Sequence, residues 1–138
     1  MTAKEKAYYK YADYRYRSMI LDTIASEKQL DEPTLLSFIL KETEHDSELG
    51  EVTLAFVGNS YHKLIHAKLI EGDSKTGIIK LTEYGESAVR NGTWHGLALT
   101  AWVGYKSLTM SQWALMIALG SFVVAIVSLL LVSLNKCT

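Results

Sequence analysis

Trp113–Leu134 reads WALMIALGSFVVAIVSLLLVSL, and residues 107–135 contain no charged side chain. In a helix, 22 residues span roughly 33 Å, which matches a bilayer hydrocarbon core of about 30 Å. The only polar side chains in this stretch are three serines, so a helix here has no polar stripe to turn toward water. The stretch therefore predicts a single-pass transmembrane helix at 113–134. The chain then divides into a head, a membrane anchor in the lipid bilayer and a short tail, 135–138.

The rest of the chain is long enough for one compact domain. Its single cysteine, Cys137, follows the predicted span, so no internal disulfide or thiolate metal site can form. Residues 1–17 are basic and rich in tyrosine, with no apolar run typical of a secretory signal. We therefore expect a tail-anchored protein with its head on the cytoplasmic side, most simply of a bacterial inner membrane.

Charge is unevenly distributed although the formal net charge is −1. Residues 1–17 hold five basic and two acidic side chains, residues 22–51 hold two and nine, and residues 52–110 hold six and four. The three segments therefore carry formal charges of 5 − 2 = +3, 2 − 9 = −7 and 6 − 4 = +2. A protein with this distribution is segmentally polarised, and its net charge does not favour nucleic acid.

The head is predicted to be mainly helical. Residues 4–28 contain no proline or glycine and carry apolar side chains at helical spacing. Asp31-Glu32-Pro33 is typical of a helix start, because the acid caps free N–H groups and proline fits the first turn. After that helix we expect another helix over 52–70, interrupted near 58–60. A hairpin should follow, in which Leu69-Ile70 pairs with Ile78–Leu81 around a turn-rich tip at 72–77. A short helix should then run from Thr82 to Asn91-Gly92.

Residues 69–89, LIEGDSKTGIIKLTEYGESAV, resemble the wing and following helix of bacterial winged helix-turn-helix domains of the MarR/PadR type. In that family a recognition helix ends in Leu-Ile, a polar wing follows, and the chain resumes with a Leu-Thr and a nearby glycine; here Leu69-Ile70 and Leu81–Gly85 stand at these places. The resemblance covers about residues 18–90. It implies an α+β, mainly α, fold over 18–92, with three helices, a short β-hairpin wing and a further helix before the transmembrane helix.

The resemblance also implies that residues 52–70 contain a recognition helix that meets a duplex or a protein. His62 and His66, four residues apart, lie on one helix face, but no further ligand stands at a telling spacing, so we expect no metal. The acidic run over 42–51 would repel a duplex, and the cations are few, so DNA and protein both remain candidate partners. The candidate contacts are Asn59, Ser60, His62, Lys63, His66, Lys75 and Lys80.

Five tyrosines lie within residues 8–16, in an N-terminal helical extension over 1–17. On a helix they surround the axis, so one face cannot bury them all. Tyr8, Tyr11 and Tyr14 predict self-association with a second copy. The alternatives are packing on the head, stacking on single-stranded nucleic acid and contact with lipid headgroups.

The juxtamembrane segment 93–112 contains the apolar stretch Trp94–Tyr105, which is too short to span a bilayer alone. It either packs on the head as a last helix, lies in the membrane surface as an aromatic belt, or forms a re-entrant hairpin. Within the span, small residues recur every three or four positions on one face, which favours close helix packing in lipid and a homodimer. These are Ala114, Ala118, Ser121, Ala125 and Ser128.

No catalytic motif occurs in the chain: it has no GxSxG, no phosphate-binding glycine loop, no HExxH and no usable cysteine nucleophile. We therefore expect neither an enzyme nor a cofactor nor a small-molecule substrate. The sequence predicts a membrane-tethered winged-helix protein that recruits a protein or double-stranded DNA to the cytoplasmic membrane face as a dimer, in its narrower form a membrane-bound transcription regulator. The alternative is a small membrane effector, of toxin or phage-defence type, whose hydrophobic segments perturb the bilayer.

Overall fold

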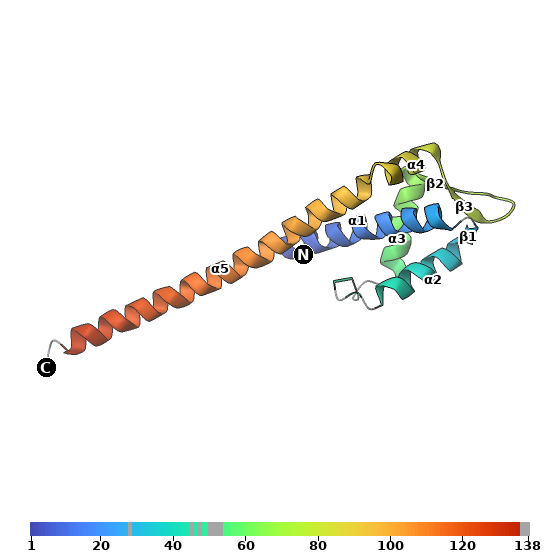
Figure 1. Ribbon diagram of the computed structural model, residues 1–138. Helices are drawn as coiled ribbons and strands as arrows, with labels where there is room; N and C mark the ends of the chain where they lie inside the picture. Colours follow the sequence, from blue (N-terminus) through green and yellow to red (C-terminus); the bar gives the residue numbers. More distant parts are fainter. Residues whose placement is uncertain (28, 45, 47, 50–53, 136–138) are drawn as a thin grey trace.

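The computed structural model describes the chain except for residues 28, 45, 47, 50–53 and 136–138, and for 129–135 it describes the backbone alone. Most of the predicted tail therefore lies outside the described residues, as does part of the acidic run. The described elements are α1 (Ala3–Ser26), β1 (Leu30–Asp31), α2 (Glu32–Thr43), α3 (Leu54–His66), β2 (Ile70–Gly72), β3 (Ile78–Leu81), α4 (Glu83–Arg90) and α5 (Thr93–Asn135) (Figure 1).

The helices begin where side chains satisfy their free backbone N–H groups. Thr2 and Glu5 form a capping box at the start of α1, in which Glu5 N donates to Thr2 Oγ1 over 3.1 Å. Asp31 accepts from Thr34 N at 3.0 Å and caps α2, which has proline in its first turn. Thr82 caps α4 in the same way. The predicted starts of α2 and α4 are thus confirmed.

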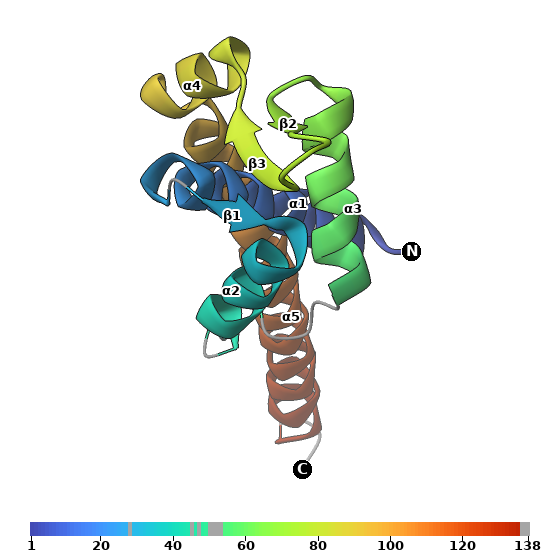
Figure 2. The ribbon, with the colours of Figure 1, turned by 90° about the vertical axis from the view of Figure 1, so that its right-hand side faces the viewer.

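A small antiparallel sheet closes one end of the head, with strand order β1-β3-β2. The predicted hairpin is present, with Ile70 opposite Leu81. β1 was not predicted, and it pairs with β3 through Leu30 and Ile79. Figure 2 shows α3 beside β2, with α2 following β1 and α4 following β3. The α+β, mainly helical fold class is therefore confirmed.

The core of the head forms around α1. Tyr16, Ile20 and Leu21 of α1 are buried together with Leu35 and Ile39 of α2, residues of α3, and Ile79 of β3. The buried residues of α3, which include Tyr61 and Leu64, recur at helical spacing and therefore form one inner face of the helix. Gly58 does not interrupt α3, so the break expected near 58–60 is absent. The burial of α1 on several sides explains why its sequence lacks a clear polar face.

α5 is one helix of 43 residues and combines the predicted juxtamembrane segment and span. Its first third lies alongside α1, which runs in the opposite direction, and its remainder projects away from the head (Figure 1). Every residue from 110 to 128 is exposed, including large apolar side chains on all sides of the helix. Within the described part of the chain, α5 is the one helix long and apolar enough to cross a membrane.

Candidate functional site

The outer face of α3 and the neighbouring β2–β3 hairpin, residues 70–81, form the surface on which the predicted contacts lie; for brevity this hairpin is called the wing. Asn59, His62 and His66 are exposed on α3, and Lys75 and Lys80 are exposed on the wing and β3. The wing tip is ordered locally, because Asp73 accepts a bond from Lys75 N at 2.8 Å, while Gly77 adopts a left-handed φ of 68°. We call these five exposed residues the α3–wing face.

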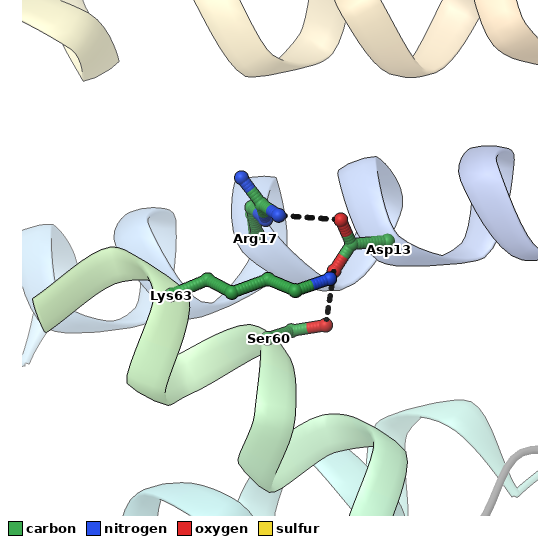
Figure 3. Close-up of polar contacts among 4 residues, drawn as sticks. All are labelled: Asp13, Arg17, Ser60 and Lys63. Atoms are coloured by element: carbon green, nitrogen blue, oxygen red, sulfur yellow. Dashed lines mark hydrogen bonds and ion pairs between the residues drawn. The ribbon is translucent and has the colours of Figure 1, made fainter. Parts of the chain in front are cut away.

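Ser60 and Lys63, the other two predicted contacts, are turned toward α1 instead. Ser60 is completely buried, so its side chain is not on the outer surface of α3. Its hydroxyl donates to Asp13 Oδ1 over 2.8 Å, and the Lys63 ammonium lies 3.3 Å from the same oxygen (Figure 3). The sequence predicted Ser60 as a surface contact. In the structure its side chain points into the interior of the head, although its neighbour Asn59 is exposed.

Asp13 is the centre of a polar cluster that joins α1 to α3. Besides Ser60 and Lys63, it binds Arg17 on the next turn of α1, where the Arg17 guanidinium lies 2.5 Å from Asp13 Oδ2. Arg17 in turn stacks over the ring of Trp94 at the start of α5, 4.8 Å from its centroid. We call Asp13, Arg17, Ser60 and Lys63 the Asp13 cluster.

The Asp13 cluster therefore fixes three helices relative to one another. The pairing of Asp13 with Arg17 was not predicted from the sequence. The available signal was their spacing of four residues, which puts opposite charges on one face of a helix. Their burial could not be foreseen, because it depends on contacts with residues about fifty and eighty positions later in the chain.

Glu48 forms a second connection, between the segment before α3 and α5. Its Oε1 lies 2.8 Å from the Lys106 ammonium, and its Oε2 accepts from the Trp102 indole at 2.9 Å. The Tyr11 hydroxyl also donates to Oε2, over 3.4 Å. The hydrogen bond from Lys106 is the main cause that holds the pKa of Glu48 below its ordinary value.

The tyrosines of α1 are covered largely by this same chain. Tyr11 is buried, and this burial is the main reason that its pKa is raised to about 12. Tyr8 packs against Tyr105 with ring centroids 5.7 Å apart, and Tyr14 against Trp94 at 5.8 Å. Three alternatives were considered for Trp94–Tyr105, and in the structure this segment packs on the head as part of a helix. Its aromatic side chains cover the α1 tyrosines, a role that the sequence had suggested for a second copy of the chain.

The small residues predicted for self-association all lie on the exposed part of α5. Ala114, Ala118, Ser121, Ala125 and Ser128 are all exposed. The same spacing continues toward the head through Gly104, Ser107 and Ser111, which are exposed as well. A Cβ placed on Gly104 would meet no atom within 4 Å. One face of α5 is thus lined by small residues from the head into the predicted span.

Among the described residues, no group of three or more His, Cys, Asp or Glu side chains is placed to hold a metal ion, and His62 and His66 have no third ligand there. Comparison with protein-family models, with curated proteins and with solved structures found no match. The candidate functional surfaces of the described residues are therefore the α3–wing face and α5.

Proposed function

We propose that this protein is a membrane-tethered, non-catalytic binding protein with a winged-helix head. α5 anchors it, and the α3–wing face recruits a macromolecular partner to the membrane surface. The observation that carries the proposal is α5 itself, which begins within the folded head and continues as an uncovered apolar helix. The proposed location is the cytoplasmic face of a bacterial inner membrane.

The need for a membrane follows from the exposed surface of α5. Phe122, Val123 and Val124 each keep more than half of their surface exposed, and similar side chains surround the whole helix. Fully burying one such side chain contributes about 1.5–3 kcal/mol, so the exposed row would cost a soluble protein a large free energy. Lipid removes that cost without requiring a protein partner on every side.

The winged-helix assignment is supported by the order of elements and of strands. α2 and α3 precede a hairpin, β1 completes a sheet of order β1-β3-β2, and α3 leads directly into β2. α3 buries Val57, Tyr61 and Leu64 and leaves Asn59, His62 and His66 outward. Outward polar residues on this helix and cations on the wing are the features with which such domains meet a major groove or a protein.

The test of duplex binding uses the full chain in lipid nanodiscs. Mixed DNA fragments are titrated at low and moderate salt, and binding is followed by fluorescence anisotropy. Lys75→Glu with Lys80→Glu should abolish salt-sensitive binding, because each lost cation contacts phosphate. Lys63 is avoided, because its reversal would place an acid beside Asp13.

A suitable control is Lys6→Glu, an exposed charge reversal near the N-terminus of α1 where the helix dipole tolerates an acid. Equal retention of the wing variant and wild type on DNA would exclude a DNA-recognition role for the wing. If wild type shows no binding even at low salt, the proposal is narrowed to a protein partner, which crosslinking in intact membranes would identify.

We also propose that two copies associate through the small-residue face of α5. Because lipid tails are as apolar as the helix, close packing across small side chains replaces the hydrophobic drive between helices. Ala118→Leu with Ala125→Leu should therefore weaken crosslinking in membranes. Met116→Leu with Val123→Leu, on the opposite face, should leave it unchanged; equal loss in both variants would contradict a specific interface.

The effector alternative has less support. Where the effector uses Trp94–Tyr105 in addition to the span, that segment has to leave the head and enter the bilayer. In the structure Trp94 stacks on Arg17 and Trp102 donates to Glu48, so its release would break both contacts. A collapse of membrane potential on expression, lost when α5 is replaced by an unrelated span, would favour that alternative over the tether.

A further inference from the structure

The start of α1, Glu48 and the first third of α5 line an open cavity of about 750 Å³. This lies within the size range of small-molecule sites, roughly 300–1,000 Å³. The cavity is polar, and it lies where α5 leaves the head, since the N-terminus of α1 is beside the end of the first third of α5 (Figure 1). Its lining contains three tyrosines, two lysines and two glutamates, namely Tyr8, Tyr9, Tyr105, Lys4, Lys106, Glu5 and Glu48, together with Thr2.

The charges in this cavity balance. Among the described residues Lys4 forms no ion pair, whereas Lys106 pairs with Glu48 at 2.8 Å. A lysine ammonium has three donors, so Lys106 retains capacity for a second acceptor. Glu5 uses Oε2 to accept from Thr2 N, and its other oxygen remains as an acceptor. The cavity therefore offers donors for an anion and an acceptor for a cation side by side.

The tyrosine rings add a surface that attracts cations. Tyr8 lies between Tyr9 and Tyr105, with ring centroids 5.6 Å and 5.7 Å away. Tyr9 also packs on Phe56, which holds its ring in place while nearly half of the residue stays exposed. Ring faces bind ammonium groups, including quaternary ones, at distances within about 6 Å.

Along α5 the cavity lies just outside the lipid headgroup layer. From Lys106 to Trp113, where the predicted span begins, the helix rises roughly 10 Å. The polar headgroup layer is about 5–7 Å thick on each side of the hydrocarbon core, so the backbone of Lys106 stands about 3–5 Å beyond it, a gap that a lysine side chain can bridge. This step rests on the proposed function, because it requires α5 to span the bilayer.

We propose that this cavity binds the headgroup of a zwitterionic phospholipid, a phosphate joined to an ammonium group. The phosphate lies against Lys4 and Lys106. The ammonium lies against Glu5 and the exposed face of Tyr9. A purely anionic headgroup lacks the ammonium and would leave the Glu5 carboxylate without a cation, since Glu48 already pairs with Lys106, so the balanced charges select against it.

The test measures lipid binding to the full chain by native mass spectrometry from a non-ionic detergent. Phosphatidylethanolamine, phosphatidylcholine and phosphatidylglycerol with identical acyl chains are compared. Wild type should retain both zwitterionic lipids in preference to phosphatidylglycerol. Lys4→Gln with Glu5→Gln should weaken this retention roughly tenfold, because two charge-assisted contacts are lost. Glutamine at position 5 preserves the capping box, so α1 remains capped.

The matched control is Lys6→Gln, which removes an exposed charge from the same helix outside the cavity and should retain the wild-type preference. Equal or tighter retention of phosphatidylglycerol by wild type, or equal loss in both variants, would overturn the proposal. Membrane insertion of α5 is measured separately in vesicles with brominated acyl chains, which quench the fluorescence of a tryptophan that lies in the bilayer. The quenched component should disappear in Trp113→Phe. Quenching without lipid preference refutes the headgroup site alone, whereas absent quenching refutes the tether.

Discussion

Replacing Asp13 by alanine should be the most damaging single truncation of an ionic side chain in the head. Asp13 is buried, and its carboxylate binds Arg17 at 2.5 Å and Ser60 at 2.8 Å. Without it, the Arg17 side chain, 13% exposed, loses its ion partner, and the completely buried Ser60 hydroxyl loses its acceptor. The guanidinium Nε of Arg17 already has no hydrogen-bond partner among the described residues.

The size of this effect follows from burial. Removing one partner of a buried ion pair costs about 3–5 kcal/mol. We take the lower end, about 3 kcal/mol, because Lys63 is 43% exposed and returns to water, and because Arg17 keeps its contact with Trp94. For a domain of this size about 1 kcal/mol shifts Tm by 4–8 °C, so Tm should fall by about 12 °C or more.

Asp22→Ala is the matched control, because Asp22 is also an acid of α1 that contacts a side chain of another helix. It lies 2.7 Å from His95, but the two side chains are 42% and 50% exposed, and exposed pairs contribute about 0–1 kcal/mol. Denaturation of the full chain in detergent micelles, followed by tryptophan fluorescence, compares both variants with wild type. A difference between Asp13→Ala and Asp22→Ala below about 1 kcal/mol would refute the assignment of the Asp13 cluster as a structural centre.

Two further perturbations test other contacts. Gly85→Ala should destabilise the head by about 2 kcal/mol or more, because its Cβ would stand 2.0 Å from the Leu69 carbonyl oxygen. Gly58→Ala should instead stabilise α3 by about 0.5–1 kcal/mol, because its Cβ would meet no atom within 4 Å. Denaturation measures both changes in the free energy of unfolding. The pKa of Glu48 is lower in the folded protein than its ordinary value of 4.5. The contacts of its carboxylate therefore contribute fully to stability above pH 4.5 and are lost as the pH falls through the lowered pKa. Trp102 emission should therefore titrate in acid, and Glu48→Gln should remove that transition.

Local sequence signals predicted the elements whose determinants are local. The caps at Asp31 and Thr82 and the turn residues of the wing fixed the starts of α2 and α4 and the position of the hairpin. β1 escaped prediction because two residues carry no periodicity. Its pairing of Leu30 with Ile79 depends on a strand almost fifty positions away.

The packing of the α1 tyrosines shows a second limit of what can be predicted from sequence. Tyrosines all around a helix predicted a partner helix, and a second copy was the expected source. The structure supplies that helix from the same chain, since Tyr8 and Tyr14 pack on Tyr105 and Trp94 of α5. Aromatic residues before a span predict membrane interfaces and helix packing equally well, so only the tertiary contacts decide between the two.

These contacts bear on how a tethered head would meet its partner. Flexible linkers let a domain search all orientations, whereas a helix is a rigid spacer. Here α5 enters the head without a break, and Glu48 joins the segment before α3 to Trp102 and Lys106 of α5. In the proposed membrane-bound state the α3–wing face is therefore held at a fixed angle to the bilayer. The wing lies at the end of the molecule away from the C-terminus, so a partner approaches from the side or from above, and two copies joined through α5 present their faces in one fixed geometry (Figure 1).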